Sequence, residues 1–324
     1  MTDIAILLNP SAGGERASRK RARLEAILKQ DGIHSRIFVS KTEDDLRSLT
    51  AQKSREFPVI VGAGGDGTIA GIVQVLQENN LNNTVGIIPF GSSNDIAREF
   101  GVNDLGKACA AIRNGKTKDV DLGVLTGNDR VSHYFLGTAS LGLGVTVNKY
   151  VEEMAKRYPA LPEMQNILGA LGVYHSISSG KIPVPLELKN DNSSLLNHFF
   201  LIVFYNTRFY ASGKLPNPDA KPNDGVLNCY CHTAIPLHDI NEPLWQLDLF
   251  ERFYLFWKKV SAIGNIRQPN PKDVKRIAAP EFKIVSGEGT EIQTDGKVLG
   301  PYRDITIYVK PKSLKLIVSP SYER

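Results

Sequence analysis

A glycine-rich run at residues 61–68, VGAGGDGT, is the strongest chemical signal in the sequence. It follows an apolar stretch typical of a buried strand and precedes apolar residues at helical spacing. Glycines let backbone N–H groups approach phosphate oxygens closely, and a helix N-terminus adds the positive end of its dipole. Asp66 would repel a bare pyrophosphate, whereas it suits Mg²⁺ as a ligand. The run therefore predicts a site for a nucleotide phosphate together with its metal ion.

A dinucleotide site and a plain turn both fit this run less well. Gly62, Gly64 and Gly67 match the dinucleotide fingerprint G-x-G-x-x-G. The next predicted strand, however, ends in residues 89–91 (PFG), with no acidic residue placed for a ribose. A glycine turn without a ligand is the simpler alternative, although a turn alone rarely needs so many glycines.

Two further turns are expected at the same edge of the predicted sheet. Residues 9–14 (NPSAGG) follow the first predicted strand, and residues 89–95 (PFGSSND) follow the fourth. Each turn is short, polar or rich in glycine, and each precedes a helix. Ligands of parallel sheets bind beyond the carboxyl ends of the strands. Three such turns favour a nucleoside triphosphate as the ligand.

The hydrophobic pattern predicts the elements that position these turns. Over the first 122 residues, strand-like runs alternate with helical stretches, one of which carries Leu24, Ile27 and Leu28 on one face. Strands are predicted at 3–8, 35–39, 58–61 and 84–89, and helices at 15–30, 44–54, around 72–76 and at 95–100. Thr42 is the expected N-cap of the second helix. Repeated β-α units imply a doubly wound, mostly parallel sheet with helices on both faces.

The pattern changes after about residue 121. Strand-like runs now follow one another closely, at 133–137, 184–188, 199–205, 226–231, 282–285, 305–309 and 314–318. Turn residues separate them, which predicts an antiparallel β-sandwich, interrupted by helical stretches near 145–179 and 244–263. The expected domains are residues 1–122 and 123–310, and the final strand in 311–324 either completes the first domain or stays with the second.

The composition is that of an ordinary globular protein, with 42% hydrophobic and 23% charged residues. No apolar run approaches the roughly 20 residues that span a bilayer. The net charge of +5 is too small to identify a partner, and no RNA- or DNA-reading motif accompanies the basic residues at 16–23. Those residues form either a solvated helix face or a surface for anionic phosphate. Three cysteines and the lack of a secretory pattern predict a cytoplasmic protein.

In their order, these motifs resemble the diacylglycerol kinase catalytic domain family, which also contains sphingosine kinases, ceramide kinases and bacterial lipid kinases. The resemblance continues in the second half of the chain, at residues 139–142 (ASLG), 205–213, 218–220 (PDA), 223–227 (NDGVL) and 294–297 (TDGK). It therefore covers nearly the whole chain. It implies an α/β fold with an NAD-kinase-like nucleotide domain and a β-sandwich domain for the lipid, as in the soluble bacterial branch.

The resemblance also implies the roles of individual residues. Those expected to hold ATP are Asn9, Gly13, Thr42, Gly64, Gly65, Asp66, Gly67, Thr68, Ser92, Asn94 and Asp95. Asp66, Asp95 and Asp121 would organise Mg²⁺ and its waters, and Asp224 with the main-chain oxygens of Lys221 and Val226 would form a structural metal site. Asp295 would act as the general base, and Asp66 would support catalysis through the metal.

The expected activity is transfer of the ATP γ-phosphate to the hydroxyl of a diacylglycerol-like or sphingoid lipid. The partners would be ATP, a lipid alcohol and a membrane surface contacted peripherally. Residues 158–177 and the aromatic stretch 245–257 belong either to the protein core or to an apolar surface that contacts the lipid. A homodimer is possible through the same aromatic stretch. Nucleic acid is not an expected partner.

The sequence departs from the family at two places. Lys297 stands where an acidic residue usually follows Asp-Gly, and Ala70 and Gly71 replace an Asn-Glu pair. The Asp295-Gly296 dipeptide is also common in plain hairpin turns. A member that binds nucleotide or lipid without transferring phosphate therefore stays an alternative, as does an NAD kinase, which shares the glycine run.

Overall fold

The N-terminal part of the chain forms a parallel sheet, as its continuous apolar runs predict. The computed structural model describes residues 3–10, 16–157, 169, 171–173, 175–176, 182–233 and 274–323. Strands β1 (Ile4–Leu8), β2 (Ser35–Val39), β3 (Val59–Gly64) and β4 (Thr84–Pro89) lie in the order β4-β3-β1-β2. All residues of β1 are buried because helices cover both faces of this sheet.

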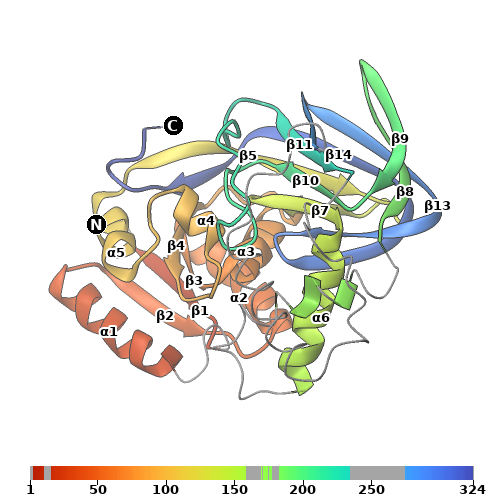
Figure 1. The fold of residues 1–324 in the computed structure, drawn as a ribbon. Coiled ribbons are helices and arrows are strands. Elements are labelled where there is room, and N and C mark those ends of the chain that lie inside the picture. The colour runs from red at the N-terminus through yellow and green to blue at the C-terminus, as the bar shows by residue number, and fades with distance from the viewer. Residues whose placement is uncertain are drawn as a thin grey trace.

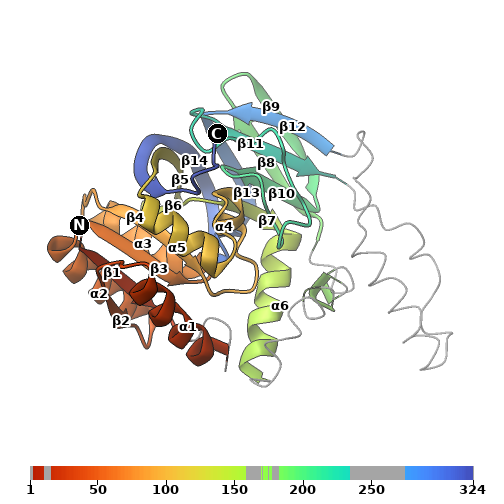
Figure 2. The same cartoon turned by 90° about the vertical axis from the view of Figure 1, so that its left-hand side faces the viewer.

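The strand order determines which face each helix covers. The helices of this part are α1 (Arg16–Gln30), α2 (Glu43–Glu56), α3 (Asp66–Glu78), α4 (Asp95–Glu99) and α5 (Leu105–Asn114). The chain moves one way across the sheet from β1 to β2 and the other way from β2 through β3 to β4. Right-handed crossovers then place α1 opposite α2 and α3. Accordingly, α1 contacts α5, and α2 contacts α3 (Figure 2).

Antiparallel strands make up most of the described residues that follow α5 (Figure 1). They are β5 (Thr117–Thr126), β6 (Ser132–Phe135), β7 (Thr138–Gly142), β8 (Val184–Asn190), β9 (Ser193–Phe199), β10 (Leu201–Tyr205), β11 (Leu227–His232), β12 (Val274–Ala279), β13 (Glu281–Thr294) and β14 (Lys297–Ile317). Their apolar side chains share a second core, which includes Phe135, Phe204 and Phe282. Helix α6 (Leu143–Arg157) follows β7. The predicted fold class, α/β followed by antiparallel strands, is confirmed.

One long strand joins the two parts into a single sheet. The sequence predicted separate strands at 305–309 and 314–318, but both belong to β14, with a bulge between Lys310 and Leu314. Pro311, within the bulge, has no N–H to donate, and Lys312 has a φ of +47°. Beyond the bulge, β14 pairs in parallel with β4, so that Leu316 lies opposite Val85.

Two sequence predictions fall mainly outside the described residues. The helical stretch predicted at 145–179 begins as α6, but most of residues 158–177 lie beyond the described part, as does the aromatic stretch 245–257. Among the described residues, no helix is long and apolar enough to cross a membrane.

Candidate active site

The turns after β3 and β4 pack backbone against backbone. The carbonyl oxygen of Gly64 accepts hydrogen bonds from the amides of Phe90 (2.8 Å) and Gly91 (3.2 Å). A Cβ atom on Gly91 would lie 2.4 Å from the Cα atom of Gly65, and one on Gly64 would lie 2.3 Å from the Thr68 hydroxyl oxygen. Only glycine fits this close approach. The carboxyl ends of the two neighbouring strands therefore converge, as the sequence predicted.

The turn after β1 joins the same place. The side-chain amide of Asn9 donates to the hydroxyl oxygen of Thr68 at 3.1 Å, and its backbone amide donates to Ala63 at 3.0 Å. Thr68 is buried in the first turn of α3, whereas Gly67 is exposed with open space around it. Gly13, also expected to hold ATP, lies outside the described residues.

Thr42 ends the turn after β2, and Ser92 lies in the turn after β4. Thr42 is the N-cap of α2, as predicted, and its hydroxyl oxygen accepts a hydrogen bond from the amide of Asp45 at 3.1 Å. Ser92 is exposed in the turn after β4. In that turn Asn94 adopts a φ of +48°, and its side-chain amide donates to the carbonyl of Gly91 at 2.6 Å. The turn is thus fixed locally while its serine faces outward.

Asp66 is directed at the N-terminus of α4. Its carboxylate accepts hydrogen bonds from the backbone amides of Asp95 (3.0 Å) and Ile96 (3.1 Å). Burial raises the pKa of Asp66 in spite of these bonds. Burial, with the nearby charge of Asp66, raises the pKa of Asp95 to about 6. Two neighbouring carboxylates with raised pKa values form a place where a cation would be stabilised.

The carboxylate of Asp95 also binds the second part of the chain. One oxygen accepts from the Arg98 guanidinium, and the other accepts from the backbone amide of Ser212 at 2.8 Å. The hydroxyl groups of Ser93 and Ser212 are 2.9 Å apart. Asp95 therefore links the turn after β4 to the loop that follows β10.

Asp295 lies in a two-residue turn between β13 and β14. Asp295 and Gly296 have φ values of +45° and +93°, as a tight hairpin turn requires. The carboxylate accepts hydrogen bonds from the amides of Leu136 (2.8 Å), Gly137 (3.0 Å) and Thr138 (2.8 Å). Burial raises the pKa of Asp295 to about 7, against the lowering effect of these amides and with a further contribution from Asp66.

Gly137 shows how closely these pieces approach one another. A Cβ atom placed on Gly137 would lie 2.7 Å from the Asp295 carboxylate and 3.4 Å from the side chain of Ile96 in α4. Asp295 thus lies against the beginning of the helix whose amides bind Asp66. The structure brings together Asp66, Asp95 and Asp295 from three separate turns.

Asp121 lies in a different set of contacts. Its buried carboxylate accepts from the amides of Gly225 and Lys312, both at 2.8 Å. Gly225 follows Asp224, and burial and the charge of Asp121 raise the pKa of Asp224. Asp121 therefore belongs with the loop that carries Lys221, Asp224 and Val226. The expected role of Asp121, which is to organise Mg²⁺ together with Asp66, would therefore be indirect and would need water or ligand atoms between the two carboxylates.

The two carboxylates of Asp66 and Asp95 suit a metal ion that is also held by the phosphates of a bound substrate. The described residues contain no cluster of three or more His, Cys, Asp or Glu side chains placed to hold a metal. Mg²⁺ commonly keeps several waters and binds one or two carboxylates plus substrate phosphates. Asp66 and Asp95, adjacent to the glycine turns, fit that arrangement.

The contact that holds α4 against the second part was not predicted. The carboxylate of Glu99 is buried and accepts from the backbone amide of Arg208 at 2.9 Å and from its Nε at 3.0 Å. The guanidinium groups of Arg98 and Arg208 both lie over the ring of Phe209. A glutamate and an arginine 109 positions apart give no local signal, so only the fold reveals the pair.

A polar cluster beside the site was also not predicted. Tyr210, Ser140 and Gln293 bond one another, with the Tyr210 hydroxyl 2.9 Å from that of Ser140 and 3.0 Å from the Gln293 amide nitrogen. Asn148 of α6 donates to the oxygen of Gln293. Burial raises the pKa of Tyr210, and the charge of Asp95 adds to this effect. The cluster therefore lies near Asp95, and Ser140 in the ASLG motif was its one signal.

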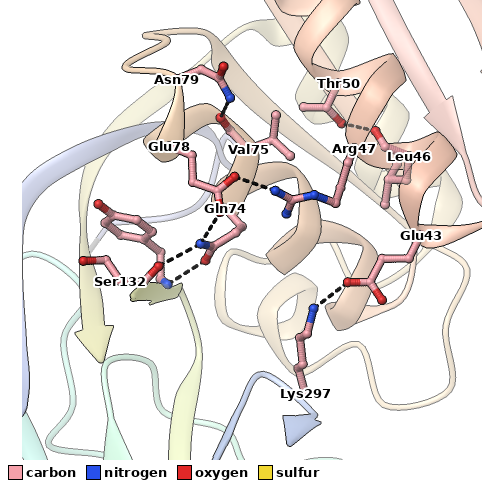
Figure 3. Close-up of polar contacts among 11 residues, drawn as sticks. Glu43, Leu46, Arg47, Thr50, Gln74, Val75, Glu78, Asn79, Ser132 and Lys297 are labelled. Atoms are coloured by element: carbon pink, nitrogen blue, oxygen red, sulfur yellow. Dashed lines mark hydrogen bonds and ion pairs between the residues drawn. The ribbon is translucent and has the colours of Figure 1, made fainter. Parts of the chain in front are cut away.

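Helices α2 and α3 make further contacts with the second part (Figure 3). Gln74 of α3 donates to the carbonyl of Ser132 at 2.9 Å and accepts from the amide of Tyr134 at 2.8 Å. Gly71, one of the departures from the family pattern, lets α2 approach closely, because a Cβ atom there would lie 3.3 Å from Leu46.

Comparison with known proteins finds a family match for the first part of the chain. Residues 3–125 match the family model described as the diacylglycerol kinase catalytic domain. The chain is 26% identical over 229 residues to a diacylglycerol kinase of Bacillus subtilis, covering 69% of this chain and 71% of that protein. It is 29% identical over 229 residues to a diacylglycerol kinase of Mycobacterium tuberculosis, with the same two coverages.

A solved structure shows that the likeness in fold extends over the whole chain. A diacylglycerol kinase from Bacillus anthracis covers 99% of this chain, with 98% of its own chain matched, at 18% identity and a TM-score of 0.67. The first part of the chain is therefore similar to the diacylglycerol kinase catalytic domain over residues 3–125, and the fold resembles that of the Bacillus anthracis protein.

Proposed function

We propose that the protein is an ATP-dependent kinase that transfers the γ-phosphate to the hydroxyl of a diacylglycerol-like or sphingoid lipid. The observation that carries this proposal is the meeting of Asp66, Asp95 and Asp295 beside the glycine turns. Phosphoryl transfer needs positioning and charge neutralisation more than covalent chemistry. The glycine turns would position the phosphates, and the carboxylates of Asp66 and Asp95 would hold the neutralising metal ion. The carboxylate of Asp295 would accept a proton. The names of the similar proteins agree with this activity.

The nucleotide would lie along the edge where the turns converge. Gly64, Gly65, Gly67 and Thr68 present the start of α3, where backbone N–H groups and the helix dipole favour phosphate. Asn9 orients Thr68 from the neighbouring turn. The adjacent turns at this edge carry Thr42, which follows β2, and Ser92 and Asn94, which follow β4.

Asp66 and Asp95 would hold Mg²⁺, which supplies positive charge to neutralise the phosphate oxygens during transfer. Their own positions do not depend on the ion. Two amides of α4 fix Asp66, and Arg98 together with the Ser212 amide fixes Asp95. The Asp121–Asp224 loop, with the main-chain oxygens of Lys221 and Val226, is the proposed site of a structural ion.

Asp295 would accept the proton of the lipid hydroxyl. As that oxygen forms its bond to the γ-phosphorus, the bond from phosphorus to the bridging oxygen breaks, and the proton passes to the Asp295 carboxylate. A base works best when its pKa is near the working pH, and the pKa of Asp295 is about 7. The amides of Leu136, Gly137 and Thr138 fix the carboxylate in one orientation.

The lipid would approach from a membrane surface that the protein contacts peripherally from the cytoplasm. The acceptor lipid is proposed to bind between the second part of the chain and the Asp295 turn. The segments proposed for membrane contact, 158–177 and 245–257, lie mostly outside the described residues.

Transfer of labelled phosphate from ATP tests this function. The acceptors would be diacylglycerol, monoacylglycerol, sphingosine and phosphatidylglycerol in mixed micelles, with NAD in a parallel reaction. We expect at least one lipid to be labelled and NAD to stay unlabelled. Labelled NAD would make the protein an NAD kinase. Binding of ATP without transfer to any acceptor would make it a non-catalytic binding protein.

A further inference from the structure

Lys297 forms an ion pair that spans the two parts of the chain. Its ammonium lies 2.6 Å from the carboxylate of Glu43 (Figure 3). Glu43 is the first residue of α2, in the nucleotide part, and Lys297 is the first residue of β14. Both side chains are well exposed, at 59% for Lys297 and 63% for Glu43.

The pair places a lysine beside the turn that carries the proposed base. Lys297 comes two residues after Asp295, and the tight turn fixes Lys297 opposite Thr294. Glu43 comes directly after Thr42, the N-cap of α2 at the edge where the nucleotide is proposed to lie. The ammonium of Lys297 therefore lies between the turn of the base and a turn of the nucleotide edge.

The pair is not needed to hold the two parts together. Exposed ion pairs contribute little to stability because water and salt screen them. The same interface is already held by the bonds of Gln74 to Ser132 and Tyr134, and by the buried contact of Glu99 with Arg208. Glu43 is thus a weak and replaceable partner for Lys297.

We propose that Lys297 is a phosphate-binding residue, which leaves Glu43 and binds the terminal phosphates of ATP. This inference rests on the proposed kinase function. A triphosphate carries more negative charge than one exposed carboxylate, and charge-assisted bonds from ammonium to phosphate are strong. A lysine beside the base turn would also stabilise the charge that spreads over the oxygens of the γ-phosphoryl group in the transition state.

The two residues then affect nucleotide binding in opposite directions. Lys297→Ala removes a phosphate contact and weakens ATP binding. Glu43→Gln removes the competing carboxylate and strengthens ATP binding. In the double variant the effect of Glu43→Gln disappears, because Lys297 is absent. If the ion pair only holds the two parts together, loss of either partner removes the same contact. Both single variants would then change the affinity for ATP in the same direction.

Calorimetric titration of the full chain with ATP and with AMP, both with Mg²⁺, tests the proposal. We expect Lys297→Ala to raise the Kd for ATP about tenfold, equivalent to about 1.4 kcal/mol, without changing the Kd for AMP. Glu43→Gln should lower the Kd for ATP about twofold, a small effect because the pair is exposed, and Lys297→Arg should stay close to wild type. Melting curves without nucleotide serve to confirm that the variants fold.

The outcomes separate this inference from the proposed function. An unchanged Kd for ATP in Lys297→Ala, or equal loss of ATP and AMP binding, would overturn the role of Lys297 even if the wild type phosphorylates a lipid. An ATP-specific loss in Lys297→Ala supports it even if no lipid is phosphorylated. A wild type that binds no ATP would overturn both.

Discussion

Two hydrogen bonds join Asp295 and Thr138. The amide of Thr138 donates to the Asp295 carboxylate at 2.8 Å, and the amide of Asp295 donates to the carbonyl of Thr138 at 2.9 Å. This double contact joins the turn between β13 and β14 to the start of β7. It fixes the backbone and the carboxylate of Asp295 together, so that the orientation of the proposed base follows from strand pairing.

Asp295→Asn should lower kcat by about 10²- to 10⁴-fold, the usual contribution of a general base. The KM for ATP should change little, because the glycine turns are untouched. An amide in this place also directs an N–H group at backbone N–H groups, so the melting temperature should be measured alongside kcat. Asp191→Asn, an exposed residue in the turn between β8 and β9, is the matched control and should retain full activity. Near-wild-type turnover of Asp295→Asn would remove this residue from the role of base.

The rate should depend on pH through the protonation of Asp295. The pKa of Asp295 is about 7, raised from 3.8 by burial, so the carboxylate is protonated and inactive as a base at lower pH. Values of kcat/KM, which report the free enzyme, should therefore rise with pH through about 7 and level off above it. A profile that falls over this range would contradict the assignment.

Folding stability should show the opposite trend. The folded pKa values of Asp295 and Asp95, about 7 and about 6, both lie above the ordinary aspartate value of 3.8. The native state therefore binds more protons between these limits. The stabilising contribution is fully present below pH 3.8 and is lost as the pH rises through 6 and 7. In metal-free buffer, the advantage of the wild type over Asp295→Asn in melting temperature should shrink from about pH 5 to about pH 8, and an advantage that grows would contradict this sign.

Gly91→Ala should separate the two glycine turns. The added Cβ atom would lie 2.4 Å from the Cα atom of Gly65, and backbone cannot move aside as a flexible side chain can. We expect a loss of about 3 kcal/mol in the free energy of unfolding, the upper part of the usual overpacking range, together with weaker ATP binding. Gly67→Ala, in the first turn of α3, is the control for the stability measurement, because nothing lies within 4 Å of its Cβ position. Equal losses in the two variants would show that the close approach is not the cause.

Arg208→Ala should destabilise the whole protein. It removes the guanidinium that pairs with the carboxylate of Glu99, whose side chain is 0% exposed, and leaves only the backbone amide of residue 208 from this contact. Breaking a buried pair from one side costs about 3–5 kcal/mol, which urea unfolding would detect. Arg113→Ala removes the exposed pair with Asp31 and should cost less than about 1 kcal/mol. A similarly small loss of stability in Arg208→Ala would mean that its contact with Glu99 does not stabilise the packing of the two parts.

Local chemistry made much of the nucleotide edge predictable. The glycine run, the N-cap at Thr42 and the Asp295-Gly296 turn depend on residues close together in sequence. Continuous apolar runs such as β1 identified the parallel strands because both faces of that sheet are covered. The fold class followed from the spacing of these elements.

Contacts between distant positions were not predictable in the same way. The pairing of Glu99 with Arg208, and the contacts of Asp121 with Gly225 and Lys312, join segments more than 100 residues apart. No local pattern records which glutamate will meet which arginine. The joining of two predicted strands into β14 was missed because Pro311 and the residues around it resemble a turn in sequence, whereas in the fold they form a bulge.

The continuity of β14 constrains how the protein could change shape. This strand begins next to the proposed base and ends paired with β4, whose carboxyl end leads into the nucleotide edge. β5 runs beside it across both parts. Domain closure around a substrate would therefore require bending of two paired strands, most readily at the bulge between Lys310 and Leu314, and could not occur by rotation about a loose linker. Substrate-induced movements should accordingly be small in amplitude and coupled along the whole length of the sheet.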